Sequence, residues 1–257
     1  MVNVERAQTF KDLHRKGTPL ILYNVWDVGT AKAVQQAGAK AIATSSAAVA
    51  VANGFSDRQD LPIDLALANL RRIVAAVDLP VTLDFESGYA ASPDELGPNI
   101  RQVIEAGAVG INFEDQIIGG TGLYSIETQC ARIAAVRQAA DELSFPLFIN
   151  ARTDLFLKKN VSEHTEALLE EAIERAKAYR LAGASGIFAP GLRRDDLIRT
   201  LCDASPLPVN IMIYPDTFAP GQLAACGVSR ISYGAVPYGA MVAFLKADAE
   251  RAFADGN

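Results

Sequence analysis

The chain has 257 residues, of which 50% are hydrophobic, and a formal net charge of −6. This length and composition suit one large α/β domain with a closed core. The absence of a Lys- and Arg-rich run argues against a nucleic-acid partner, and no run of about eighteen apolar residues predicts a membrane span.

Three cysteines, Cys130, Cys202 and Cys226, fall in separate predicted helices or helix ends, and none belongs to a CxxC pair. They therefore predict neither a disulfide framework nor a zinc ribbon. Residues 1–16 are polar and charged and lack the apolar core of a signal peptide. We expect a reduced, cytoplasmic protein.

Eight short apolar runs recur along the chain, separated by longer amphipathic stretches. Each run is almost continuously apolar, as expected for a parallel strand that is buried on both faces. The runs cover residues 20–25, 41–45, 81–85, 109–113, 147–151, 186–189, 209–213 and 229–233. The sequence therefore predicts eight parallel strands that alternate with helices.

Helix start and stop signals lie between these runs. Ser92-Pro93-Asp94-Glu95 predicts a helix start, because Ser caps, Pro suits the first helical position and acids favour the first turn. The segment from Ser162 to Thr165 predicts the start of the longest helix. Four glycines are each expected to end a helix just before a strand: Gly38, Gly107, Gly183 and Gly227.

We predict that residues 1–257 form one α/β domain, a (β/α)₈ TIM barrel. The alternative is an open, doubly wound sheet. The even spacing of the units and the lack of a Gly-rich dinucleotide turn after the first strand favour the closed barrel.

The C-terminal strand ends of such a barrel meet at one mouth, where active sites lie. Most residues at the predicted strand ends are polar. They are Tyr23 and Asp27 after the first strand, Ser45 and Ser46 after the second, Asp84 and Glu86 after the third, Glu114 after the fourth, Arg152 and Asp154 after the fifth, and Asn210 in the seventh.

The acidic residues of this set predict a metal site. Asp84 and Glu86 are two residues apart, so on a strand they point to the same side, and Glu114 follows the neighbouring strand. Unpaired carboxylates repel one another, and a hard divalent cation removes the repulsion. We predict Mg²⁺, with Mn²⁺ as an alternative ion; a metal-free acid/base pair, as in glycosidases, is the other hypothesis.

Arg152 and the serine pair are candidate substrate-binding groups. A fixed guanidinium can bind a carboxylate with two hydrogen bonds. Arg152 can also form a structural ion pair with Asp154 or Glu114, and the two roles can coexist. Ser45 and Ser46 begin a strand-to-helix turn that can hold a carboxylate or an oxyanion. Their alternative role is helix N-capping.

Four motifs, TSSAAVAVANGFSD, LDFESGY, INFEDQ and INARTD, occur in this order at barrel-strand spacing. Together they resemble the isocitrate lyase/phosphoenolpyruvate mutase superfamily, over about residues 20–238. The resemblance implies that Asp84 and Glu86 bind Mg²⁺, directly or through water, that Glu114 joins them as a ligand, and that Asp57 is a further acidic residue near the metal.

The same resemblance implies substrate contacts for Ser45, Ser46 and Arg152. Members of the superfamily form or cleave C–C or P–C bonds next to a 2-oxo acid through a metal-bound enolate. They are usually tetramers that exchange the last barrel helix between neighbouring subunits. We therefore expect a homo-oligomer, a dimer or a tetramer, with the last helix swapped.

The sequence departs from the superfamily pattern after the fourth strand. Residues 116–124 read QIIGGTGLY, without the Lys-Lys/Arg-Cys-Gly-His loop of the isocitrate and methylisocitrate lyases. The Lys and Asn of the mutase and phosphonopyruvate hydrolase loop are absent too, and Ala43 replaces their aromatic residue. Residues 119–122 are either a glycine-hinged lid or an ordinary turn.

We predict a Mg²⁺-dependent carbon–carbon lyase that acts on a small 2-oxo or 2-hydroxy (di)carboxylic acid. Cleavage or decarboxylation, of the methylisocitrate lyase or oxaloacetate decarboxylase kind, would pass through an enolate that the metal stabilises. The alternatives are P–C chemistry and a non-catalytic 2-oxo acid binder. We expect a small-molecule substrate, with no nucleic-acid or membrane partner.

The proposed catalytic residues are Arg152, Glu114 and Tyr124, of which Glu114 and Tyr124 are candidate bases. Tyr23 and Asn210 join the serines as substrate-binding candidates, although packing at the mouth is the alternative role for Tyr23 and for Trp26. His14 and His164 are interpreted as surface residues on helices.

Overall fold

The computed structural model describes residues 4–117, 119–215 and 217–255. Eight parallel strands form one sheet in this part of the chain, and each overlaps one of the predicted runs. The strands are β1 (Leu20–Leu22), β2 (Ile42–Ala43), β3 (Val81–Asp84), β4 (Gly110–Glu114), β5 (Phe148–Arg152), β6 (Gly186–Phe188), β7 (Val209–Met212) and β8 (Arg230–Ser232).

The sheet closes into a barrel. Hydrogen-bonded neighbours follow the order β1-β8-β7-β6-β5-β4-β3-β2, and a parallel bridge between Val25 and Thr44 joins the two ends. In that bridge, the Val25 N–H donates to the Ala43 carbonyl at 2.9 Å, and the Ser45 N–H donates to the Val25 carbonyl at 3.1 Å. The predicted (β/α)₈ TIM barrel is confirmed.

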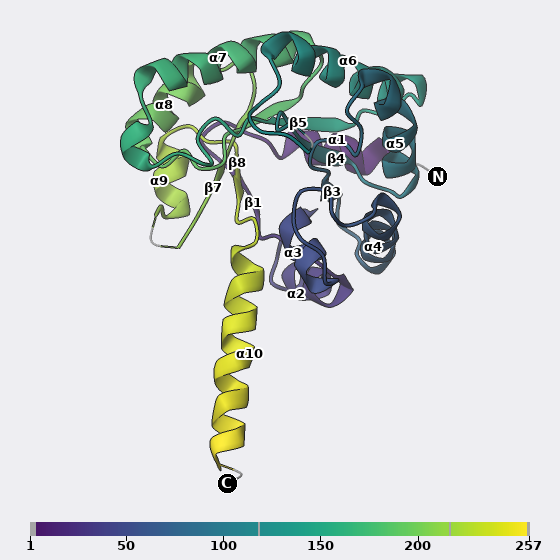
Figure 1. Cartoon of the computed structure of the whole chain (residues 1–257), viewed down its shortest axis with the longest axis vertical. Helices are drawn as coiled ribbons and strands as arrows, with labels where there is room; N and C mark the ends of the chain where they lie inside the picture. Colours follow the sequence, from purple (N-terminus) through teal and green to yellow (C-terminus); the bar gives the residue numbers. More distant parts are fainter. Residues whose placement is uncertain (1–3, 118, 216, 256–257) are drawn as a thin grey trace.

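Helices follow the strands and cover most of the outside of the barrel (Figure 1). They are α1 (Val4–Asp12), α2 (Val28–Gln36), α3 (Ser46–Ala52), α4 (Ile63–Ala76), α5 (Pro93–Glu105), α6 (Ile126–Glu142), the 3₁₀ helix η1 (Val161–Glu163), α7 (Glu166–Leu181), α8 (Asp195–Ala204), α9 (Pro220–Ala225) and α10 (Val236–Asp255). Among the described residues, none of these helices is both long and apolar enough to cross a membrane.

Local sequence signals explain most helix ends. Ser92 caps α5 in a capping box with Glu95, as predicted. The four predicted helix-ending glycines all have positive φ angles, between 88° and 106°. The predicted start at Ser162 is wrong, because Ser162 lies in η1 and the following helix begins at Glu166 with Thr165 as its cap. This helix is not the longest either, since its 16 residues compare with 17 in α6 and 20 in α10.

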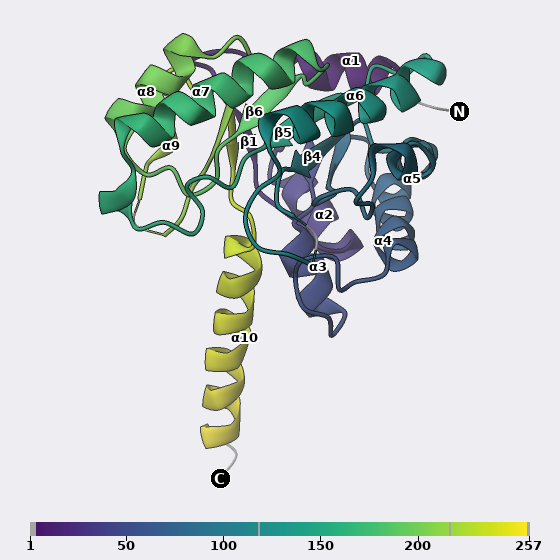
Figure 2. The ribbon, with the colours of Figure 1, turned by 45° about the horizontal axis from the view of Figure 1, so that its top comes forward.

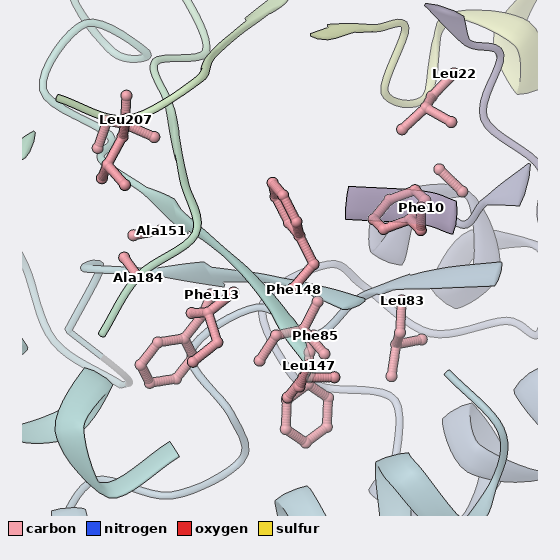
Figure 3. Close-up of a cluster of buried hydrophobic side chains, with 14 of the residues drawn as sticks. Phe10, Leu22, Leu83, Phe85, Phe113, Leu147, Phe148, Ala151, Ala184 and Leu207 are labelled. Carbon is pink, nitrogen blue, oxygen red and sulfur yellow. The ribbon is translucent and has the colours of Figure 1, made fainter. Parts of the chain in front are cut away.

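The N-terminal end of the barrel is closed by α1. The Phe10 side chain is fully buried and its ring lies edge-on against that of Phe148, with centroids 5.5 Å apart. Figure 3 shows these two rings next to each other in the hydrophobic core. Gly110 leaves room for this packing, because a Cβ atom on residue 110 would lie only 3.0 Å from a ring carbon of Phe10.

The interpretation of both histidines as surface residues is wrong. The His14 ring stacks on Phe148 with centroids 4.0 Å apart, and its Nδ1 lies 2.8 Å from the Phe10 carbonyl oxygen. Burial, and to a smaller extent the charge of Arg230, lower the pKa of His14 to about 3. His164 follows η1 and is only 1% exposed. His164 therefore lies in the packed interior, and the half-buried His14 packs its ring against that interior.

The last helix contacts the barrel through Tyr238 in its first turn, and most of its length lies away from the barrel. Figures 1 and 2 both show α10 extending away from the other elements. Several large apolar side chains on this helix are exposed, and Phe244 and Leu245 are the clearest examples at 68% and 62%. The outer face of β1 is open as well, because Ile21 is 44% exposed in the middle of that strand.

Candidate active site

Acidic and basic side chains come together where β3, β4 and β5 end. Asp84, Glu114 and Arg152 are the last residues of these three strands. The strand register places Glu114 directly opposite Arg152, and Asp84 opposite Asn112. The C-terminal mouth of the barrel therefore contains the predicted cluster.

Asp84 is held in one orientation by three donors. Its Oδ2 accepts hydrogen bonds from the Ser46 N–H at 3.0 Å and from the Ser46 hydroxyl at 2.8 Å. Its Oδ1 accepts a third from the Asn112 side-chain amide at 3.2 Å. The serine predicted to bind substrate thus contacts the predicted metal ligand.

Glu86 is buried and lies just beyond β3, in the left-handed backbone region at φ 51°. Its Oε2 accepts a hydrogen bond from the Gln59 N–H at 2.7 Å. Burial is the main cause that raises the pKa of Glu86 to about 8, and three nearby carboxylates add to the effect: Asp84, Asp57 and Glu114. Backbone strain of this kind is concentrated at functional sites.

Arg152 binds two carboxylates at once. Its Nε and one terminal nitrogen donate to Asp154 at 2.6 and 2.9 Å, and its other terminal nitrogen lies 2.9 Å from Glu114 Oε2. The structural ion pairs considered for Arg152 are therefore both present. Burial raises the pKa of Glu114, and the Arg152 charge acts in the opposite direction.

Asp57 lies in the loop between α3 and α4. Burial, and the Asp84 charge more weakly, raise the pKa of Asp57, whereas a hydrogen bond from the Arg58 backbone opposes the increase. The Asp84 charge therefore acts on Asp57, and a role for Asp57 beside a metal stays a prediction.

The donor set of the mouth fits a hard divalent cation, because carboxylate oxygens of Asp84, Glu86 and Glu114 act on one another and carry repelling charge. Within residues 4–117, 119–215 and 217–255, no three Asp, Glu, His or Cys side chains form a ready-made cage. Mg²⁺ does not need one, since it keeps several waters and binds through one or two carboxylates and substrate oxygens.

The serine pair also has a structural role. Ser45 caps α3, and its hydroxyl accepts a hydrogen bond from the Ala48 N–H at 3.4 Å. Ser45 is buried and Ser46 is half-buried. A substrate carboxylate at this turn would compete with Asp84 for the donors of Ser46.

Asn210 lies inside the barrel, below the mouth. Its Oδ1 accepts a hydrogen bond from Asn150 at 3.0 Å, and Asn150 also donates to Asn112 at 2.9 Å. Asn112 in turn binds Asp84. Asn210 is thus connected to the acidic cluster through two other amides and is not in direct contact with it.

Tyr124 is not brought to the carboxylates. Its ring lies against the Arg132 guanidinium, 4.5 Å from ring centroid to Cζ. Arg132 is fully buried and donates to the carbonyls of Ser87 and Ala90. This stacking ties Tyr124 to the loops that support the site.

Tyr23 points out of the barrel. Its side chain is 45% exposed, whereas its neighbours Leu22 and Asn24 are buried. The ring lies 5.0 Å from that of Tyr233 and lines an outer groove with Ile21. Trp26 is buried and packs edge-on against Tyr238, as its alternative packing role predicts.

A cavity of about 290 Å³ opens next to the acidic cluster. It is lined by Arg58, Gln59, Glu86, Ser87, Glu114, Gln116, Ile117, Gly119 and Gly120. The glycine loop after β4 therefore forms one wall of the cavity. Ile118, between two of these residues, lies outside the described residues.

Asp115, a further acidic residue at the end of the fourth strand, has two partners, Arg175 and Tyr179, that the sequence did not predict. Asp115 is fully buried and pairs with Arg175 at 3.1 Å, while the Tyr179 hydroxyl donates to the same carboxylate oxygen at 3.2 Å. Burial raises the pKa of Asp115 to about 6. Arg175 also pairs with Glu171, four residues earlier on α7, so its sequence pattern resembles that of a surface ion pair.

Comparison with known proteins gives the family. The family model described as phosphoenolpyruvate phosphomutase matches residues 10–253. A crystal structure described as a "putative phosphonomutase" from Burkholderia cenocepacia J2315 is 48% identical, with a TM-score of 0.95, and the match covers 97% of this chain and 99% of that one.

Two further matches extend the comparison. The 2-methylisocitrate lyase of Escherichia coli (strain K12) is 29% identical over 91% of this chain and 80% of its own length. A crystal structure of phosphonopyruvate hydrolase with oxalate and Mg²⁺ shares the fold, with a TM-score of 0.84 at 23% identity over 98% of this chain and 88% of that one. The chain belongs to the phosphoenolpyruvate phosphomutase family, within the isocitrate lyase/phosphoenolpyruvate mutase superfamily.

Proposed function

We propose that the protein is a Mg²⁺-dependent carbon–carbon lyase that acts on a small 2-oxo or 2-hydroxy (di)carboxylic acid, by C–C cleavage or decarboxylation. The observation that carries the proposal is the buried acidic cluster: burial, and after it the charges of three neighbouring carboxylates, raise the pKa of Glu86. A cation in this position would stabilise their charged forms. The phosphonopyruvate hydrolase named above, which has the same fold, contains Mg²⁺.

The metal would be held by Asp84 and Glu86, directly or through water, with Glu114 and Asp57 beside it. Mn²⁺ is the alternative ion, since it also prefers oxygen ligands. A bound Mg²⁺ would supply positive charge next to the C2 oxygen of the substrate, where negative charge develops.

Arg152 would bind a substrate carboxylate. Asp154 holds its guanidinium by two hydrogen bonds, so the fork keeps a fixed direction while one terminal nitrogen faces Glu114. Ser45 and Ser46 would bind at the other end of the acid. Asn210 would position Asp84 through the chain of amides described above. Tyr23 points outward, so it is the least supported of the proposed substrate contacts.

Decarboxylation fits the side chains present. In oxaloacetate the C3–C4 bond would break and C4 would leave as CO₂. The electron pair of that bond would form the C2–C3 double bond, while the π pair of the C2 carbonyl moves to its oxygen. C3 of this enolate would finally take up a proton to give pyruvate. Glu114 lines the cavity, and burial favours its protonated form. We therefore prefer Glu114 to Tyr124 as the group that exchanges this proton, because Tyr124 stacks on Arg132.

One pyruvate assay covers the candidate reactions, because oxaloacetate, 2-methylisocitrate and phosphonopyruvate would each yield pyruvate. The substrate that is turned over then identifies the reaction. We expect pyruvate from oxaloacetate or 2-methylisocitrate in the presence of Mg²⁺, above the enzyme-free rate, and none after treatment with EDTA. Turnover of phosphonopyruvate alone, with release of phosphate, would replace this proposal by P–C chemistry. Mg²⁺-dependent binding of oxalate without any turnover would identify a 2-oxo acid binder.

We also propose that the protein is a homo-oligomer, a dimer or tetramer, in which α10 packs on the outer wall of a neighbouring barrel. The exposed apolar side chains of α10 and the open outer face of β1 support this arrangement. Sedimentation velocity should show an oligomer that Phe244→Asp dissociates. A monomeric wild-type protein would contradict the proposal. A cytoplasmic location stays a prediction.

A further inference from the structure

The loop that contains Asp57 presents an arginine to the cavity. Arg58 and Gln59 both have positive φ angles, 74° and 62°, which non-glycine residues rarely adopt. The Gln59 N–H donates to Glu86, and the Ser56 N–H donates to Asp60 at 2.8 Å. The backbone on both sides of Arg58 is therefore fixed against the acidic cluster and within the loop itself.

Arg58 differs from Arg152 in its partners. Each nitrogen of the Arg152 guanidinium binds Asp154 or Glu114, so only the second N–H of each terminal nitrogen stays available for a substrate. The Arg58 guanidinium has no side-chain hydrogen bond or ion pair within the part of the chain that the structure describes, although its charge acts on Asp57. Arg58 thus keeps its donors available for a ligand.

The charge of the cavity favours such a ligand. Among the described residues that line it, Arg58 is the positively charged one, while Glu86 and Glu114 are the acidic ones. Gln116 and Ser87 are neutral. An anionic group that enters from the solvent would meet attraction on the Arg58 side of this wall and repulsion on the carboxylate side.

We propose that Arg58 binds the carboxylate at the end of the substrate remote from C1 and C2, so that the site prefers 2-oxo or 2-hydroxy dicarboxylates to monocarboxylates. The inference rests on the proposed function, which places C1 and C2 at the metal. Arg58 would then act as a specificity-determining residue, since a guanidinium binds a carboxylate through two hydrogen bonds.

Calorimetric titration with a matched set of small ligands tests the proposal. Malate and 2-hydroxybutyrate differ in one group, a remote carboxylate against a methyl group, and oxalate has no remote group. In the presence of Mg²⁺, Arg58→Gln should weaken malate binding about tenfold, equivalent to about 1.4 kcal/mol. Binding of 2-hydroxybutyrate and oxalate should change less than about twofold, and Arg58→Lys should keep part of the preference.

Arg71→Gln is the control, because Arg71 is an exposed arginine on α4 away from the cavity; it should leave all three affinities unchanged. Equal weakening of the three ligands by Arg58→Gln would show a disturbed loop, and unchanged malate binding would show no contact. Either result overturns the assignment of Arg58 to the remote carboxylate. The proposed function still stands in that case, provided that the wild type binds oxalate.

Tighter binding of 3-phosphonolactate than of malate, lost in Arg58→Gln, would assign the remote group as a phosphonate instead. If the wild type binds no oxalate with Mg²⁺, the proposed function fails and this inference fails with it.

Discussion

The two ends of the barrel are both buried, but they are built from different chemistry. At the N-terminal end, Phe10 of α1 and His14, two residues after that helix, place their rings against Phe148, and burial lowers the pKa of His14 to about 3. At the C-terminal end, Glu86 and Glu114 are buried as neighbouring carboxylates, and Glu86 has left-handed backbone.

The difference indicates how the barrel divides its roles. Aromatic packing at the N-terminal end removes apolar surface from water and stabilises the fold. Burying neighbouring carboxylates at the other end costs free energy that a bound cation would offset. Residues at the first end should therefore change stability, and residues at the second end should change binding.

Phe10→Ala should have the largest effect on stability. It removes a fully buried ring from the closed end, so the free energy of unfolding should fall by about 3–5 kcal/mol, measured by urea denaturation. Mg²⁺ affinity should stay the same. Leu181→Ala, at a side chain that is 91% exposed, is the control and should change stability by less than about 0.5 kcal/mol. A loss below about 1 kcal/mol for Phe10→Ala would show that α1 does not close the barrel.

Asp84→Ala should have the next largest effect, at the other end. Loss of the proposed ligand should weaken Mg²⁺ binding more than about 100-fold, or about 2.7 kcal/mol, while circular dichroism shows a folded barrel. Asp64→Ala removes an exposed acid of α4 and should leave the affinity unchanged. Wild-type Mg²⁺ affinity in Asp84→Ala would show that the ligand assignment is wrong.

Arg152→Lys should weaken substrate binding. A lysine keeps the charge but cannot reproduce the fork that Asp154 orients, so KM should rise about tenfold. Arg101→Lys changes an exposed arginine that pairs with Glu142 and should leave KM unchanged. If KM is also unchanged in Arg152→Lys, the role of Arg152 is structural.

His14→Gln should have the smallest effect, visible in the pH dependence of stability. The folded-state pKa of His14 is about 3 against 6.5 in the unfolded chain, so the unfolded chain binds the proton more tightly. The contribution of the uncharged His14 ring to the free energy of unfolding is therefore fully present above pH 6.5, and it is lost as the pH falls from there toward 3. Between pH 7.5 and 5.5 the wild type should lose about 1 kcal/mol more than His14→Gln. Equal losses would show that His14 can be protonated in the folded state.

The sequence predicted the barrel because its strands are buried on both faces and therefore read as apolar runs. It also predicted the position of Asp84, Glu114 and Arg152, since parallel strands all end at one mouth. The outward direction of Tyr23 could have been inferred from strand alternation, because Leu22 and Asn24 point inward.

Other features depend on contacts between distant segments. His14 and His164 lie in polar sequence, and only their packing on Phe148 and Phe156 buries them. The position of Arg58 depends on the left-handed backbone angles of Arg58 and Gln59. The sequence could not predict these angles, because neither residue is a glycine or an asparagine. The partners of Arg152 likewise depend on the register of β4 and β5.

The central claim is that the acidic cluster at the mouth binds one divalent cation together with a 2-oxo acid. Titration of the wild-type protein with Mn²⁺, followed by electron paramagnetic resonance with and without oxalate, tests it directly. We expect one saturable site per chain, displaced by Mg²⁺, whose Mn²⁺ affinity increases when oxalate is added, because linked ligands strengthen each other's binding. No saturable Mn²⁺ binding, or oxalate binding that is unaffected by the metal, would contradict the claim.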